Sequence, residues 1–163
     1  MSVFADTVAP TYGTRALKMV LEMHLTVEAT PVLVTSTIYG EQDAAGTIYF
    51  TSTDNGSGPV RLTSSTSPPI SYPSPTTVGN AYSYTTHYSD ASSDDNSVTV
   101  ADMQPAAGYN AFRIHSVVTG GSVTTTTDDW FVPKVGFPVR TTGDTQNTDL
   151  NLHVTLTLSS KNF

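Results

Sequence analysis

The chain of 163 residues contains no cysteine. This absence excludes disulfide bonds, thiolate nucleophiles and sulfur-ligated metal centres together. Small secreted domains often depend on disulfides, so the composition favours a protein that is made and assembled in a reducing compartment. Residues 1–15 show no apolar core of a signal peptide, and no segment approaches the roughly 20 apolar residues of a membrane-spanning helix. We therefore expect neither export nor membrane insertion.

Charged residues are also scarce. They make up 13% of the chain, well below the roughly 25% of ordinary globular domains. The formal net charge is −7. Proteins that bind nucleic acids or anionic membranes usually draw affinity from grouped Lys and Arg side chains, and the sequence predicts neither partner because its seven basic residues are scattered. These residues are Arg15, Lys18, Arg61, Arg113, Lys134, Arg140 and Lys161.

Hydroxyl side chains take the place of charges, since Thr and Ser fill more than a quarter of the positions. The branched Cβ of Thr suits strands, whereas Ser, Gly and Pro suit turns. One interpretation is a β-rich surface coated with hydroxyl groups. The other is that neighbouring copies cover much of the surface, because charged residues are depleted from the centres of interfaces.

Two segments, residues 17–27 and 150–158, alternate almost without interruption between apolar and polar residues. Side chains along a strand point to opposite faces with a period of two, so each segment forms one apolar and one polar face. A helix would spread Leu17, Met19 and Leu21 around its axis, although several residues here are good helix formers. The pattern predicts strands, and it predicts that the first and last strands are the longest.

The remaining sequence reads as short strands separated by turn residues and by a long Ser- and Pro-rich loop at 64–79. The predicted fold is all-β: a single-domain antiparallel β-sandwich over 16–163, jelly-roll-like or related, of about eight to ten strands. Residues 1–15 are predicted to form an N-terminal arm. The expected strands are 16–28, 32–39, 47–53, 60–63, 81–88, 98–103, 109–119, 123–127, 130–132, 137–141 and 150–158, with an acidic loop at 89–97 and a polar turn at 142–148.

Five aromatic residues are the candidates for assembly or contact. Tyr82, Tyr84 and Tyr88 fall on one side of a predicted strand, and tyrosine suits contact surfaces because it is large, amphipathic and rigid. Trp130 and Phe131 follow two aspartates, and a lone tryptophan typically anchors a core or an interface. Packing within the protein's own sheet is the alternative for all five.

Asp90, Asp94 and Asp95 are candidate calcium ligands, because hard cations favour several oxygen ligands on a loop. Their spacing does not match the EF-hand pattern, and a solvated acidic loop is the alternative. His24 and His153 lie on the polar faces of the two terminal segments. If those strands pair, the two rings approach each other and bind a metal or respond to pH; otherwise both rings are solvated. No other cofactor is indicated.

The sequence contains no nucleophile elbow, P-loop or dinucleotide-binding fingerprint, and we expect no enzymatic activity. The all-β pattern and the cysteine-free, charge-poor composition favour a virion structural protein. Such a protein is a viral or phage coat, decoration or tail component that self-assembles in the host cytoplasm. Its expected partners are copies of itself and other virion proteins.

Two other classes of function are considered. A carbohydrate-binding or adhesion module would use Trp130 and the three tyrosines to contact a host-surface glycan, with calcium at Asp94 and Asp95. A hydrolase on a β scaffold would need a cleft that brings two of the named acids or histidines together.

Overall fold

A computed structural model describes residues 2–5, 10–27, 30–54, 58–146 and 151–157 of the chain. These residues form strands and turns, with no helix among them, so the all-β prediction is confirmed. The strands are β1 (Ser2–Ala5), β2 (Arg15–Val27), β3 (Thr30–Gln42), β4 (Ile48–Asp54), β5 (Val60–Ser65), β6 (Ile70–Tyr72), β7 (Ala81–Tyr88), β8 (Ser93–Ala106), β9 (Tyr109–Gly120), β10 (Val123–Val132), β11 (Phe137–Gln146) and β12 (Asn151–Thr157).

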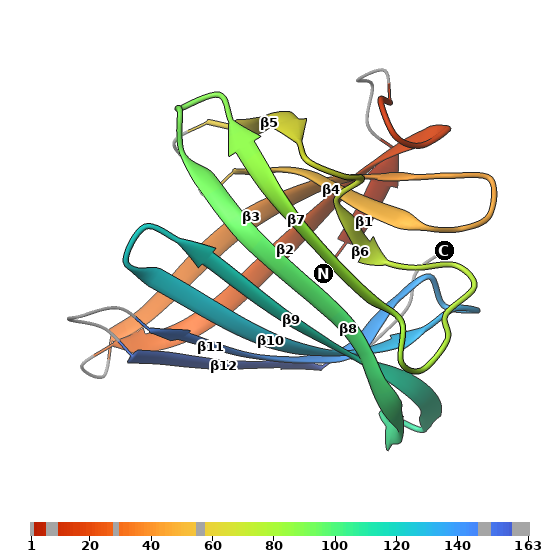
Figure 1. Cartoon of the computed structure of the whole chain (residues 1–163). Helices are drawn as coiled ribbons and strands as arrows, with labels where there is room; N and C mark the ends of the chain where they lie inside the picture. The colour runs from red at the N-terminus through yellow and green to blue at the C-terminus, as the bar shows by residue number, and fades with distance from the viewer. Residues whose placement is uncertain (1, 6–9, 28–29, 55–57, 147–150, 158–163) are drawn as a thin grey trace.

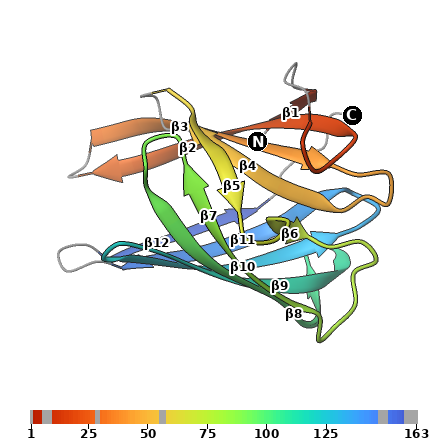
Figure 2. The same cartoon turned by 45° about the horizontal axis from the view of Figure 1, so that its top comes forward.

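The described strands form one antiparallel sheet in which the strand order follows the chain (Figure 1). The path runs from β1 to β12, and only β6 leaves it by pairing with β4. The sheet curls into a half-barrel (Figure 2). A sandwich has two packed sheets, and a jelly roll adds Greek-key crossovers. The described pairings form a single sheet, so this finer part of the prediction is not confirmed.

The prediction that the first and last strands are the longest is wrong. The longest described strand is β8 with 14 residues, whereas the predicted first segment, 16–28, forms β2 with 13 residues and follows the short strand β1, and the described part of the last strand, β12, has 7 residues. Part of the predicted acidic loop, residues 93–97, belongs to β8. Asp94 pairs with Thr86 across the sheet, and the Asn96 Nδ2 group donates to the Thr86 hydroxyl at 3.1 Å. Polar side chains that suggest a loop in sequence are satisfied here by the neighbouring strand.

The second half of the chain is also more continuous than predicted. Residues 123–132 form the single strand β10, although Asp128 and Asp129 suggested an interruption, and β11 includes residues 142–146 of the predicted turn. Residues 70–72 of the predicted proline-rich loop form β6. Within the predicted arm, Ser2–Ala5 pair with β2 of the same chain.

The main core lies on the inner face of the curled sheet, defined here as the face that carries Val100 and Ile114. Both side chains are fully buried, and the register places them opposite each other on β8 and β9. Tyr72 from β6 stacks on Phe131 of β10 with ring centroids 4.8 Å apart. Strands that are distant along the sheet therefore meet across the inner face. The buried members of this core are Ile48, Tyr84, Val98, Val100, Ile114 and Phe131.

A smaller apolar cluster lies on the opposite, outer face near the turns at one end of β8–β11. Trp130 belongs to it and is 7% exposed. Its register partners are Arg113 on β9 and Arg140 on β11, so a row of long polar side chains runs beside the indole. The other members are Ala106, Ala111, Val132, Val135 and Val139.

Candidate functional site

The predicted tyrosine stripe lies on the inner face of β7. Tyr84 and Tyr88 are 7% and 9% exposed, and Tyr82 packs against the main core. The Tyr84 hydroxyl donates to the Ile70 carbonyl at 3.2 Å, and burial raises the pKa of Tyr88 to about 12. These are the contacts of core side chains, which is the alternative that the sequence left open.

Trp130 and Phe131 lie on opposite faces of β10, and both are buried. The Trp130 Nε1 group donates to Gln104 Oε1 at 3.2 Å, and the Arg140 guanidinium lies 4.5 Å from the indole ring centre. Phe131 is 3% exposed within the main core. Neither ring offers an open face for stacking on a sugar, so a carbohydrate site built on Trp130 loses its main contact surface.

The three candidate calcium ligands make separate local contacts. Asp90 accepts hydrogen bonds from the amide and hydroxyl of Ser92, which lower its pKa. Asp95 accepts a hydrogen bond from the Thr85 hydroxyl at 2.7 Å, and Asp94 is its neighbour in a strand. Among the described residues, no three acidic, histidine or cysteine side chains are grouped so as to hold a metal ion.

The two terminal segments do not pair with each other in the described sheet. Residues 15–27 pair with β1 and β3, whereas β12 pairs with β11, so the condition for joining His24 to His153 is not met. The side chain of His24 lies outside the described residues. His153 has another partner, because its Nδ1 atom lies 2.7 Å from Asp144 Oδ1.

An ionic network that the sequence did not indicate lies on the outer face of β8–β10. Arg113 donates to both oxygens of Asp102 at 3.1 and 2.9 Å and to Asp128 at 3.3 Å. The His115 Nδ1 atom lies 3.0 Å from the same Asp128 oxygen. Hydrogen bonding and charge from Arg113 lower the pKa of Asp102. Because all four side chains are 26–40% exposed, this network adds little to stability.

Asp129, next to Asp128, points to the inner face and is 8% exposed. The Tyr72 hydroxyl donates to one of its oxygens at 2.9 Å, and the Thr141 hydroxyl donates to the other at 2.5 Å. Burial raises the pKa of Asp129 to about 6, although the two hydrogen bonds act in the opposite direction. Consecutive aspartates therefore occupy different environments, because successive strand residues face opposite sides.

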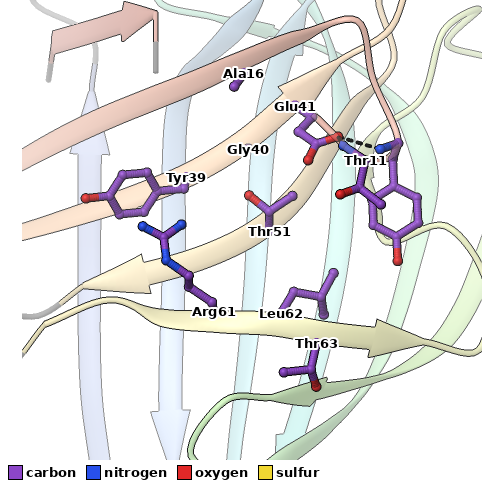
Figure 3. Close-up of a pocket in the computed structure, with 10 residues that line it drawn as sticks. Thr11, Ala16, Tyr39, Gly40, Glu41, Thr51, Arg61, Leu62 and Thr63 are labelled. Carbon is purple, nitrogen blue, oxygen red and sulfur yellow. Dashed lines mark hydrogen bonds between the residues drawn. The ribbon is translucent and has the colours of Figure 1, made fainter. Parts of the chain in front are cut away.

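An open pocket lies on the other half of the sheet, where β2–β5 meet the segment before β2 (Figure 3). Its volume is about 190 Å³. Figure 3 shows Arg61 on β5 reaching towards Tyr39 on β3. We call it the β2–β5 pocket. Its polar and aromatic lining residues include Thr11, Tyr12, Tyr39, Glu41, Thr51, Arg61 and Thr63.

One wall of the β2–β5 pocket is fixed by Glu41, which is 6% exposed. Its Oε2 atom accepts hydrogen bonds from the backbone amides of Thr11, Tyr12 and Gly13 at 2.8, 2.5 and 2.8 Å. Three consecutive amides converging on one oxygen form a concave anion-binding arrangement in which the side chain is the anion. Glu41 therefore holds the segment before β2 against β3.

We expect Glu41→Gln to lower the free energy of unfolding by about 1–2 kcal/mol, because an uncharged oxygen accepts the same three amides more weakly. Chemical denaturation of the two proteins measures this difference. Asp95→Asn is the control, since Asp95 is exposed and we expect a change below about 0.5 kcal/mol there. Equal losses in the two variants would contradict the role assigned to Glu41.

Two cationic side chains converge on one ring at the opposite wall. Lys18 Nζ lies 5.9 Å from the centre of the Tyr39 ring, and the Arg61 guanidinium carbon lies 5.8 Å from it. The register joins Lys18 to Tyr39, Tyr39 to Ser52 and Ser52 to Arg61 across four strands. Ser52 is small and 1% exposed, so the long side chains of its two register partners, Tyr39 and Arg61, can contact each other above it.

No short-range pattern in the sequence could have found this group of residues. Lys18, Tyr39 and Arg61 are more than 20 residues apart from one to the next, and strand pairing alone brings them together. The hydrolase hypothesis requires two acids or histidines in one cleft. The lining of the β2–β5 pocket supplies one, Glu41, and backbone amides already engage it.

Comparison of the chain with known protein families, curated proteins and solved structures found no match in any of the three. The described part of the chain contains no helix long and apolar enough to cross a membrane. A function is therefore inferred from the sheet, its edges and the β2–β5 pocket.

Proposed function

We propose that this protein is a virion structural protein, a coat, decoration or tail component of a virus or phage, which acts by self-assembly. The observation that carries the proposal is the state of the sheet's edges. In the described pairings β12 pairs with β11 alone and β1 pairs with β2 alone. Within the described part of the chain, the other side of each of these strands carries a row of backbone donors and acceptors without a strand partner.

The composition of these edge strands supports the proposal. Natural proteins usually protect an open edge with Lys, Pro or an inward-pointing charge. Residues 2–5 and 151–157 contain no Lys, Arg, Asp, Glu or Pro. Leu152 on β12 is 44% exposed. An uncharged edge of this kind suits strand addition by a second copy, in which backbone hydrogen bonds provide affinity and alternate side chains provide specificity.

The arrangement of positive charge supports protein partners over nucleic acid. Arg113 binds two aspartates, and Lys18 and Arg61 form a pair beside one tyrosine and not a stripe. Phosphate backbones are usually bound by a stripe of free basic side chains. The proposed partners are therefore copies of this chain and other virion proteins, without direct contact to nucleic acid or membrane. The proposed location is the virion, after assembly in the host cytoplasm.

We expect the purified chain, of 17.3 kDa, to form defined oligomers or particles, and we expect Leu152→Lys to weaken that association at least tenfold. A lysine on β12 places a charge where a second strand would pair. Size-exclusion chromatography with light scattering over a range of concentrations measures both results.

Thr119→Lys is the control, because Thr119 is exposed but lies on β9 with register partners on both sides, Asp95 on β8 and Thr124 on β10. It should assemble like the unmodified chain. Equal weakening in both variants would contradict the role of the β12 edge. An unmodified chain that stays monomeric at high concentration would overturn the proposed function.

A further inference from the structure

We propose that the β2–β5 pocket binds a carboxylate-bearing sugar, with the Arg61 guanidinium contacting the carboxylate and threonine hydroxyls contacting the sugar hydroxyls. This ligand site goes beyond self-assembly and does not depend on it. It also differs from the carbohydrate site suggested by the sequence, whose aromatic residues are buried elsewhere in the sheet.

Positive charge is concentrated around Tyr39. The chain has seven basic residues and a net charge of −7, yet two of those seven lie within 6 Å of the Tyr39 ring centre. Among the described residues, no carboxylate forms an ion pair with Lys18 or Arg61. The pocket's own carboxylate, Glu41, accepts three backbone amides. Arg61, which lines the pocket, therefore presents positive charge there, and Lys18 adds a second positive charge beside the Tyr39 ring in a protein that is negative overall.

The Arg61 side chain has the donor geometry that a carboxylate requires. A guanidinium group is planar and offers parallel N–H donors that match a carboxylate in a bidentate contact. Arg61 is exposed, and its guanidinium group lies beside the Tyr39 ring. Figure 3 shows Thr51 beside it, between Arg61 and Glu41. The cation is thus partly oriented by the ring, while its donors are available to a ligand.

The size and polarity of the pocket also favour a sugar. Its volume of about 190 Å³ is below the roughly 300 Å³ at which pockets begin to enclose drug-sized molecules. This size suits a single sugar ring. Thr11 and Thr51 supply hydroxyl groups, and Tyr12 and Tyr39 supply rigid amphipathic rings. An inorganic anion would engage the guanidinium but not the hydroxyl groups.

Saturation-transfer difference NMR on the full chain tests the proposal, because it observes the ligand and works for a monomer or a large assembly. The probes are sodium glucuronate and glucose, with inorganic phosphate as a competitor at equal concentration. We expect a signal from glucuronate at least tenfold stronger than from glucose. Phosphate should leave most of the glucuronate signal in place.

Arg61→Gln should reduce the glucuronate signal at least tenfold, whereas Arg140→Gln should change it less than twofold. The two variants are matched, because both arginines are exposed and lie beside an aromatic ring. No glucuronate signal, or an undiminished signal in Arg61→Gln, would overturn the proposal. An equal signal from glucose would show that the carboxylate plays no part in binding. Full displacement of glucuronate by phosphate would show that the pocket binds simple anions and has no specific contacts with a sugar.

Discussion

Replacing Ile114 with alanine is expected to lower the free energy of unfolding by about 3–4 kcal/mol. Ile114 is fully buried at the centre of the main core, opposite Val100 on β8 and Asp129 on β10. Removing its side chain takes away buried apolar surface and leaves a cavity that rigid strands on three sides fill poorly. Urea denaturation followed by circular dichroism measures the loss.

Met103→Ala is the control for this prediction. Met103 is 46% exposed on the neighbouring strand β8, so its truncation should cost less than about 1 kcal/mol. A loss at Ile114 no larger than the loss at Met103 would mean that the inner face of the sheet does not form the protein's principal core.

The second large effect is expected from Asp129 and depends on pH. Burial holds its pKa at about 6 in the folded protein, against an ordinary value of 3.8. Between these values the folded state binds more protons than the unfolded chain, so this group makes stability fall as pH rises. A difference of about two pKa units corresponds to about 3 kcal/mol. The contribution is unfavourable at pH 7 and is relieved as the pH falls below 6 towards 4.

Asp129→Asn removes the ionisation while keeping a side chain of similar shape between Tyr72 and Thr141. Unfolding free energies of both proteins should be measured at pH 4 and pH 7. We expect the unfolding free energy of the variant, relative to that of the unmodified protein, to be about 3 kcal/mol higher at pH 7 than at pH 4. A constant difference would show that Asp129 titrates alike in the folded and unfolded states.

Asp102→Asn provides a control of opposite sign. Arg113 lowers the pKa of Asp102 in the folded protein, so this carboxylate contributes stability above its ordinary pKa and loses it as the pH falls. Because that loss takes place around and below the ordinary pKa of 3.8, replacing Asp102 should change the unfolding free energy of the variant relative to the unmodified protein only slightly between pH 4 and pH 7, and to the disadvantage of the variant at pH 7. Shifts of the same sign in both variants would contradict the different environments of the two carboxylates.

Strand segments were predicted well where apolar residues alternate. Residues 81–88 were predicted as a strand and form β7, and the segment predicted at 109–119 is β9, Tyr109–Gly120. In both segments the inward positions must meet the main core, so the period of two is visible along the chain itself.

Prediction failed where polar residues lie inside strands. Residues 93–97 and Asp128–Asp129 suggested loops because nothing adjacent in sequence satisfies their side chains. Their partners lie on other strands: Thr86 for Asn96, Arg113 for Asp128 and Tyr72 for Asp129. A buried polar group is tolerated only when it is hydrogen-bonded, and those bonds depend on a register that the sequence does not display.

The predicted contact residues also show the difference between what residue type predicts and what the tertiary structure decides. Tyr84, Tyr88, Trp130 and Phe131 were chosen for their residue type, and residue type does not distinguish a core from an interface. Burial assigns all four to the protein's own packing. No local pattern in the sequence marks the residues of the β2–β5 pocket, because Arg61 is one scattered cation in sequence and becomes part of a group only beside Lys18 and Tyr39.

The sequence by itself determined the β class of this protein, the positions of most strands and its lack of charge, because these are properties of local periodicity and composition. Only the tertiary structure decided that the described strands form one curled sheet, which aromatic residues are buried and which charges meet. Those outcomes depend on pairing between strands that are far apart in the chain, and antiparallel pairing can join residues at any separation. The tertiary structure also decided the edges of the sheet, which support the proposed self-assembly, and the β2–β5 pocket, which supports the proposed sugar site.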